Sequence, residues 1–460
     1  MTEANGMFKR YALISVLLVL TFGVFSFCGH GITLAAEEED HLFTLSESMA
    51  LALKRSLAMD SAAKTVEGAI LDKKKALKTI LPSLNGAYSY TRLDEAPETS
   101  ATQLGPISVP ARRVGTADNW QAKLTLTQPL FTGFKVLTAY RLAKLGIDVA
   151  KISEVQEELD LILKVKEAYF GILQAQKAAE VAKQAIKQVE AHLNVARNFF
   201  EVGMITKNFV LEAEVNLAEA LQASIKAENF IVMAKASLNT LLRRSLEAPI
   251  EVEDILKYKP FAHDFTYCLD EAMKARPEIQ AVLYTIKMAE QYVRLSRGDY
   301  YPTMALTANH YLKGDTLLVN GSDYMDDYAS WDVTVALTWN FLEWGKPRNS
   351  VQKSKTELAK ARNALGQVKD GIRLEVKNNY LSMKVAEKSI AVTQKAIELA
   401  EENLRMSEER YRAQVGTSTE VIDAATRLTS VRRIYYDALY GYNLAWAALE
   451  RAMGMGRGEI

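Results

Sequence analysis

The sequence predicts an α+β membrane protein that combines long antiparallel coiled-coil helices with a transmembrane β-barrel. Three observations predict this fold class. The second half of the chain repeats the plan of the first half at a constant offset of 211 residues. Each half contains a long proline-free stretch with a helix-forming composition. Each half also contains a strand pattern with one apolar face. We therefore expect two structural repeats per chain.

The N-terminal residues 1–36 are predicted to be a secretory signal peptide. Two basic residues precede an apolar run at 11–27, and small residues then precede an acidic run. Cleavage here also removes Cys28, which follows Phe27 where a lipoprotein signal needs a small residue, so a lipid anchor is disfavoured. The mature chain keeps one cysteine, Cys268, so no disulfide is expected, and Cys268 is predicted to be buried.

The internal repeat defines the expected domain boundaries. Leu130-Phe131 corresponds to Phe341-Leu342, and the run that starts at Val210 corresponds to the run that starts at Val421. Regions upstream of the strands have an offset nine residues larger, so the length change is expected in a loop. The first repeat is expected at 37–248, with a helix, a β-hairpin at about 84–130 and a long helical hairpin that turns near 203. A linker at 249–264 follows. The second repeat is expected at 265–453, with a helix, a β-hairpin at about 303–341 and a long helical hairpin that turns near 414–417, before a short tail at 454–460.

The proline-free stretches predict unusually long helices. No proline occurs between Pro129 and Pro249, or from Arg348 to the end of the chain. Apolar residues of the second stretch recur mostly at steps of three and four, which is the spacing of a coiled-coil seam. The predicted seam is Leu358, Ala361, Leu365, Val368, Ile372, Val376, Tyr380, Met383, Ile390, Ile397, Leu404 and Tyr411. A helix over 350–413 would be about 95 Å long, so a rod is expected.

Each long helix is expected to end in a tight turn before an antiparallel partner helix. The first turn contains Gly203. The equivalent position of the second turn is Gln414, and Gly416, two residues later, could serve that turn. Thr417 and Glu420 have the spacing of a capping box, which gives Glu420 a structural role at the start of the last long helix.

Between the helices the apolar period changes to two. The predicted lipid-facing residues of the last strand are Trp331, Val333, Val335, Leu337 and Trp339, which alternate with mostly polar residues. A strand with one apolar face and aromatic ends is typical of an outer-membrane barrel. A soluble sandwich is the alternative for an isolated strand, but the repetition and the signal peptide favour a membrane. Arginine in place of Leu337 is then expected to cost about 2–4 kcal/mol near the membrane midplane.

Four strands per chain are too few to close a barrel. An open sheet edge in lipid would leave unpaired backbone groups that cost several kcal/mol each. The chain is therefore expected to share its barrel with copies of itself in a symmetric ring. Two, three or four chains would give about 8, 12 or 16 strands, and the sequence spacing does not choose among them.

Composition excludes several function classes. The chain has 56 basic and 56 acidic residues and no basic stripe interleaved with aromatic residues, so no nucleic-acid partner is expected. Its five histidines do not have the spacing of metal ligands and do not lie beside a candidate nucleophile. We expect no enzyme activity, no cofactor and no bound metal.

With these features the chain resembles the TolC family of outer-membrane efflux and secretion channels. The resemblance covers nearly the whole mature chain, and the turn motifs are its most specific part. Phe200 and Gly203, followed by the run Val210 to Ala213, match the family pattern. Tyr411, followed by the run Val421 to Ala424, also matches it.

The resemblance implies a homotrimer in the outer membrane that extends into the periplasm, in which a 12-stranded transmembrane β-barrel is continuous with a barrel of 12 long antiparallel coiled-coil helices, the tunnel. It implies a passive channel of a tripartite efflux or type I secretion system. An inner-membrane transporter would feed the channel through a periplasmic adaptor. The adaptor-docking tip would comprise Gly203, Gln414, Gly416 and Thr417.

The resemblance also implies an acidic periplasmic entrance formed by Glu420 and Asp423, which would favour cations. The alternative for these two residues is a solvated helix face. Tyr411 is expected to pack between neighbouring helices, with a latch role as the alternative. Phe209 stands where the family has an acidic residue, and Gly416 replaces a family arginine, so we expect a different closing contact. The alternative function is a periplasmic coiled-coil scaffold or spacer without a pore.

Overall fold

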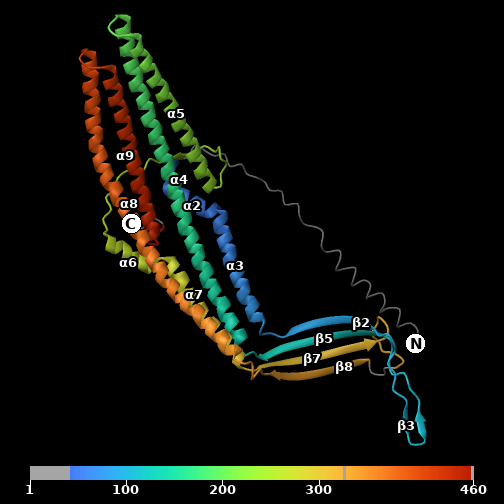
Figure 1. The fold of residues 1–460 in the computed structure, drawn as a ribbon. Helices are drawn as coiled ribbons and strands as arrows, with labels where there is room; N and C mark the ends of the chain where they lie inside the picture. Colours follow the sequence, from blue (N-terminus) through green and yellow to red (C-terminus); the bar gives the residue numbers. More distant parts are fainter. Residues whose placement is uncertain (1–41, 325–327, 457–460) are drawn as a thin grey trace. The chain divides into compact units, whose positions relative to one another are not determined.

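The computed structural model describes residues 42–324 and 328–456, and the predicted signal peptide lies outside them. Two long helical hairpins lie side by side (Figure 1). The first is α4 (Lys135–Glu201) followed by α5 (Lys207–Leu241), and the second is α8 (Lys346–Arg412) followed by α9 (Ser418–Ala452). Each bound of the first hairpin recurs 211 residues later in the second. The two hairpins therefore have helices of equal length, 67 and 35 residues.

Left-handed residues set the start of both long helices. Gly133 and Phe134 precede α4, and Trp344 and Gly345 precede α8, all with positive φ. Pro347 lies in the first turn of α8, where its missing N–H would have no helical partner in any case. This helix consequently begins four residues before the predicted start at 350.

The seam of α8 faces its partner helix as the periodicity predicts. Ile372, Val376, Met383, Ile390 and Leu404 are all buried. Elements α8 and α9 pack along their lengths, as do α4 and α5, and α4 also packs against α9. Towards the sheet, α3 (Leu57–Lys78) packs on α4, and α7 (Pro277–Arg297) packs on both α4 and α8.

The largest core lies partway along the long helices. Short elements surround it: β1 (Leu42–Phe43), α2 (Leu45–Arg55), β6 (Glu251–Val252) and α6 (Phe265–Ala275). Strands β1 and β6 pair in parallel. The Tyr169 hydroxyl of α4 donates to the carbonyl oxygens of Phe43 and Glu253, at 2.9 and 3.0 Å, which ties both strands to the helix. Cys268 is fully buried here as predicted, and burial raises the pKa of its thiol to about 11.

One antiparallel sheet joins the other ends of α3, α4, α7 and α8. Its order is β2–β5–β7–β8. The strands are β2 (Ser83–Arg92), β5 (Asp118–Phe131), β7 (Thr303–Gly314) and β8 (Ala329–Thr338), and η1 (Gly298–Tyr300) precedes β7. Pairing of β5 with β7 joins the two hairpins into one sheet, and within the described residues β2 and β8 form its edges. A small hairpin of β3 (Thr102–Leu104) and β4 (Ile107–Val109) lies in the loop between β2 and β5.

The register gives the sheet one apolar and one polar face. Leu84, Leu126, Ala308 and Val333 form a row across the four strands on the apolar face. The neighbouring row on the polar face is Asn85, Thr125, Asn309 and Asp332. Thr125 donates to Asn309 Oδ1, and Asn309 Nδ2 donates to Asp332, both at 2.9 Å. Side-chain hydrogen bonds therefore fix the strand register from the polar side.

All five predicted lipid-facing residues are exposed, but Trp339 lies just beyond the end of the strand. Trp331 is 75% exposed, and Val333, Val335 and Leu337 are each more than half exposed on the same face of β8. Trp339 was predicted as the last residue of this strand, but β8 ends at Thr338. The Trp339 indole N–H instead donates to the Tyr300 carbonyl oxygen at 3.2 Å, where the chain has left the sheet ladder. None of the helices in the described ranges has a segment long and apolar enough to cross a bilayer.

Candidate functional site

The tips of the two helical hairpins hold most of the predicted site residues. After α4, the N–H of Met204 donates to Phe199 O at 2.8 Å, and the N–H of Gly203 donates to Phe200 O at 2.9 Å. This pair of bonds is a Schellman motif, with Gly203 at the left-handed position, φ +76°. Open space surrounds the position of a Gly203 Cβ, so backbone conformation alone requires glycine there.

The second tip has the same motif without a glycine. After α8, the N–H groups of Val415 and Gln414 donate to Arg410 O and Tyr411 O, both at 3.0 Å. Gln414 itself takes the left-handed position, φ +61°, and Gly416 also takes part in the turn, because its N–H donates to Arg410 O at 3.1 Å. Gly416 allows a close approach, because a Cβ there would lie 3.0 Å from Arg410 Cβ and 3.2 Å from Tyr411 N. The strained residue and the glycine required for packing are therefore separate.

Polar groups at the second tip involve a residue that sequence reasoning missed. The Thr417 hydroxyl accepts from the Glu420 N–H at 3.2 Å, which is one half of the predicted capping box. The Glu420 carboxylate lies 3.8 Å from the Arg410 guanidinium, and both side chains are about half exposed. Asp423, one turn further along α9, is exposed. The predicted acidic entrance thus includes a basic neighbour, Arg410, which reduces its negative charge.

Tyr411 lies at the contact between the two hairpins. Its side chain is 5% exposed and packs against His192 and Phe199 of α4, with ring centroids 5.1 and 5.4 Å away. The Tyr411 hydroxyl is buried and has no partner at hydrogen-bond geometry within the described residues, although the Ser418 hydroxyl is near enough to oppose the effect of burial on its pKa. Burial raises the pKa of Tyr411. The expectation that Tyr411 packs between helices is confirmed, whereas no feature here tests its latch role.

A buried histidine connects the same helices. His192 Nε2 lies 2.8 Å from Ser418 Oγ, the first residue of α9, and both side chains are nearly fully buried. Burial lowers the pKa of His192, so the ring is favoured as the neutral form. The positive end of the α9 macrodipole lies beside it and acts in the same direction. A mid-helix histidine carries no distinguishing sequence signal, and only the packing of α4 against α9 shows this contact.

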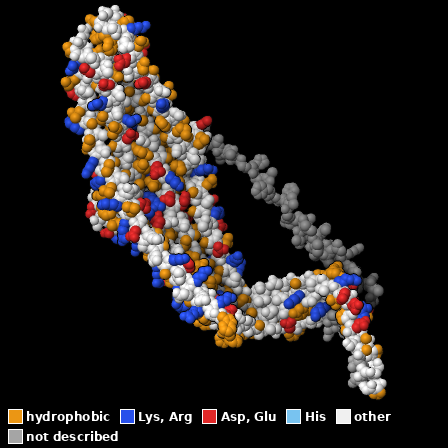
Figure 2. Space-filling view, in the orientation of Figure 1, with side chains coloured by type: hydrophobic (Ala, Val, Ile, Leu, Met, Phe, Trp, Pro, Cys, Tyr) orange, Lys and Arg blue, Asp and Glu red, His pale blue; other side chains and the backbone are white. Residues whose placement is uncertain are grey.

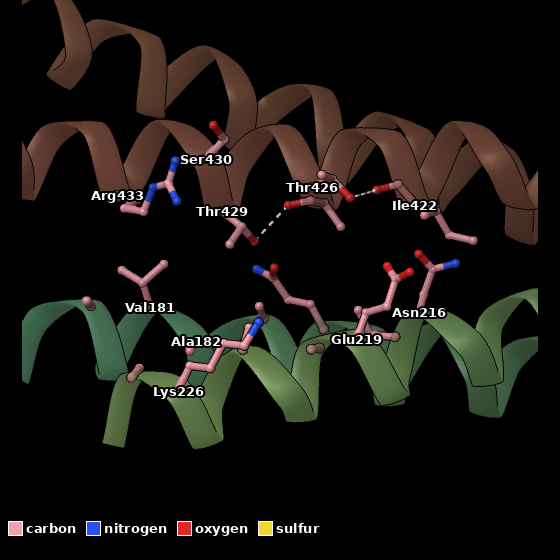
Figure 3. A pocket seen from close by; sticks show the side chains of 18 of the residues that line it. Val181, Ala182, Asn216, Glu219, Lys226, Ile422, Thr426, Thr429, Ser430 and Arg433 are labelled. Carbon is pink, nitrogen blue, oxygen red and sulfur yellow. Dashed lines mark hydrogen bonds between the residues drawn. The ribbon is translucent and has the colours of Figure 1, made fainter. Parts of the chain in front are cut away.

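At the outermost point the two tips also touch directly, since Gln414 Nε2 lies 2.7 Å from Met204 Sδ. Behind the tips a groove of about 500 Å³ separates α4 and α5 from α9 (Figure 3). Alanines such as Ala182 and Ala425 make much of its lining apolar, while Glu219, Lys226 and Arg433 add charged groups. Over their whole lengths, α4 rather than α5 makes most of the contact with α9.

Comparisons with known proteins identify the family. A sequence profile described as "Outer membrane efflux protein" matches residues 49–242 and 268–455, which is most of the chain. The chain belongs to this family. Its members are outer-membrane channels rather than enzymes, and the protein is located in the outer membrane and extends into the periplasm. The resemblance noted from the turn motifs is therefore confirmed.

The individual relatives have low sequence identity to this chain but match most of its length. The chain is 22% identical to the outer membrane efflux protein BepC of Brucella suis over 413 residues, covering 89% of this chain and 85% of BepC. It is also 22% identical to the alkaline protease secretion protein AprF of Pseudomonas aeruginosa over 350 residues, covering 74% of this chain and 70% of AprF. The solved structure of VceC from Vibrio cholerae has a TM-score of 0.73 and 18% identity, covering 90% of this chain and 96% of VceC. That likeness shows a shared fold.

Proposed function

We propose that this protein is the passive outer-membrane channel of a tripartite efflux or type I secretion system and that it works as a homotrimer. The observation that carries the proposal is the four-stranded sheet, which has one exposed apolar face and an edge strand at each side. In lipid those edges must be paired, and pairing β8 of one copy with β2 of the next supplies the missing backbone bonds. Three copies give a 12-stranded barrel, as the family resemblance implies.

The edge helices support the same ring. On α8 the exposed apolar residues Val385, Val392, Leu399 and Met406 recur every seven residues, on the side opposite the seam to α9. On α5 the exposed residues Leu211, Val215, Ile225 and Val232 form a similar heptad stripe. Helix α8 runs towards its tip, whereas α5 runs away from its tip. The stripes therefore cover the same range of heights and can interlock as an antiparallel coiled coil between copies.

In this ring the tips of three chains meet around the periplasmic opening. Glu420 and Asp423 would form an acidic entrance moderated by Arg410, and Tyr411 would act at the contact that lets the hairpins move. Gly203, Gln414, Gly416 and Thr417 would lie in the surface that a periplasmic adaptor binds. The pump and adaptor, rather than this chain, would supply energy and choose the cargo. The chain would need no cofactor, and residues 37–248 and 265–453 would be its two repeats.

The decisive experiment is the native mass of the processed protein, extracted with detergent from the outer-membrane fraction. Three chains per particle, with ion conductance after reconstitution in planar bilayers, are expected. A monomer in the soluble periplasm would contradict the channel and favour the coiled-coil spacer.

A further inference from the structure

Exposed aromatic side chains gather where the long helices join the sheet. We call this set the aromatic collar: Phe134, Tyr300, Tyr301, Trp339, Phe341 and Trp344. Phe341 is 81% exposed and Trp344 is 91% exposed. Two pairs within the set are in contact: Phe134 and Tyr301 meet edge to face with ring centroids 5.6 Å apart, and the Trp339 and Phe341 centroids lie 6.4 Å apart. Figure 2 shows hydrophobic side chains concentrated at this junction.

A tryptophan at position 344 is energetically unfavourable in the single chain for two reasons. Its backbone is left-handed, with φ +49°, whereas Gly133 occupies the equivalent position 211 residues earlier. A bulky residue in this conformation is strained by about 1–2 kcal/mol. The side chain is also almost fully exposed to solvent. An apolar or interfacial partner would bury the ring and account for a tryptophan here.

Basic residues are concentrated beside the aromatic collar. The four segments that enter or leave the sheet, 72–82, 132–144, 294–301 and 339–355, contain thirteen basic and three acidic residues, although the whole chain has equal numbers. We call the exposed members the basic band: Lys74, Lys75, Lys78, Arg141, Lys144, Arg294, Arg297, Lys346, Arg348, Lys353 and Lys355. Of the acidic residues, Asp299 and Glu343 already pair with Lys135 and Lys346, at 2.6 and 3.8 Å.

Helix electrostatics explain only part of this charge. Lys78 and Arg297 lie at the C-terminal ends of α3 and α7, where the macrodipole favours cations. Lys346 and Arg348 lie at the start of α8, where it disfavours them. The first turns of α4 and α8 contain no acidic residue, although acidic residues are favoured there. An anionic partner outside the chain would compensate for basic residues at both kinds of helix end.

We propose that the aromatic collar and the basic band together bind anionic phospholipid headgroups at the periplasmic face of the outer membrane. Aromatic side chains favour the membrane interface, and Lys and Arg bind phosphate groups. This inference rests on the proposed function, because it places the apolar face of the sheet in lipid.

The order of surfaces favours a lipid over another polyanion. Along the chain, the exposed apolar face of β8 ends at Leu337, the aromatic residues Trp339, Phe341 and Trp344 follow, and the basic residues start at Lys346. Hydrocarbon, interface and headgroup phosphate would meet these three surfaces in the same order. An anionic cell-wall polymer could pair with the basic band but would offer no apolar surface to bury the aromatic collar.

The test measures phospholipid retained by the purified native protein in detergent. The wild type is compared with a variant that carries Lys75→Gln, Lys78→Gln, Arg297→Gln and Arg348→Gln. A matched control carries Lys187→Gln, Lys226→Gln, Lys388→Gln and Arg427→Gln, four exposed positions on the helical hairpins. Native mass spectrometry counts bound dioleoylphosphatidylglycerol and dioleoylphosphatidylethanolamine at equal added concentrations. The same spectra report how many chains each particle contains.

We expect the wild type and the control to retain phosphatidylglycerol in preference to phosphatidylethanolamine. Each removed basic side chain is expected to weaken phosphatidylglycerol binding about fivefold, so the band variant should lose the preference. Equal retention of both lipids by the wild type, or an equal loss in the control, would overturn the inference. So would a band variant that keeps its lipid preference but no longer sediments with purified cell-wall sacculi. If the wild type is monomeric, the proposed channel fails first, and the spectra distinguish that outcome.

Discussion

Gln414 and Gly203 occupy the same left-handed position of two Schellman motifs that lie 211 residues apart. Glycine adopts this conformation without strain at the first tip, whereas the glutamine at the second tip is strained. The second tip also holds the contacts between hairpins through Tyr411 and Ser418. The strained backbone residue and the contacts between the hairpins therefore lie on the same tip.

Replacing Gly203 by alanine should destabilise the first tip by about 1–2 kcal/mol, because a Cβ is disfavoured at positive φ. No steric clash contributes, since open space surrounds the position. Hydrogen exchange of residues 199–206 measures the change. Gly146→Ala is the control, because Gly146 lies inside α4 with open space around it, and alanine there should stabilise the helix by about 1 kcal/mol. Loss of stability in both variants would contradict the assignment.

Acid should weaken the contact between α4 and α9 through His192. Burial lowers the pKa of the folded histidine below its unfolded value, so the unfolded state binds more protons as pH falls below about 6.5. Stability is therefore present above that pH and decreases below it, by at most about 1.4 kcal/mol per pH unit. Hydrogen exchange near 192 and 418, corrected for intrinsic rates at pH 7.5 and 5.5, measures it. His192→Gln should remove the dependence, and an unchanged pH response in that variant would assign it to another group.

The Tyr411 hydroxyl should contribute little to stability. It is buried, and its contact with the Ser418 hydroxyl lacks hydrogen-bond geometry and affects its pKa less than burial does, so Tyr411→Phe should be neutral or stabilising. Tyr442 is the comparison, because its buried hydroxyl donates to Lys259 O at 2.5 Å, and Tyr442→Phe should cost about 1 kcal/mol. Urea midpoints measure both variants. A large cost for Tyr411→Phe would instead indicate that this hydroxyl acts as a latch.

The cost of arginine on the apolar sheet face should depend on depth. The structure places Leu337 one residue from the end of β8, so the midplane cost expected from the sequence applies to Val333 instead. Val333→Arg should cost about 2–4 kcal/mol in a bilayer, and Leu337→Arg about 0–1 kcal/mol. Thr334→Arg, on the opposite face, is the control. Folding in vesicles monitored by tryptophan fluorescence measures each value. Equal costs at Val333 and Thr334 would show that the face assignment is wrong.

An acidic residue in the α8 stripe should prevent assembly of the trimer without unfolding the chain. Leu399 is 63% exposed in the single chain and packs only in the proposed ring, so Leu399→Asp should shift the detergent-extracted protein to smaller particles. Ala391→Asp, at an exposed position on another side of α8, should leave the trimer intact. Native mass and circular dichroism measure the two effects. A stable Leu399→Asp trimer would place the subunit contact elsewhere.

Features that short stretches of chain encode were predicted correctly from the amino-acid sequence. The period of three and four predicted the buried face of α8, including Ile372 and Met383, because a helix repeats its contacts every few residues. The period of two likewise predicted which side of β8 carries Trp331 and Val333.

Tertiary structure decided what depends on distant segments. Sequence patterns did not pair Arg410 with Glu420, place His192 against Ser418, or join β5 to β7 in one sheet. They also left open whether Gln414 or Gly416 takes the left-handed position of the second turn, because a glycine can satisfy either conformational freedom or close packing. Only the packing of Gly416 against Arg410 and Tyr411, at the end of α8, shows that close packing is the requirement at that residue.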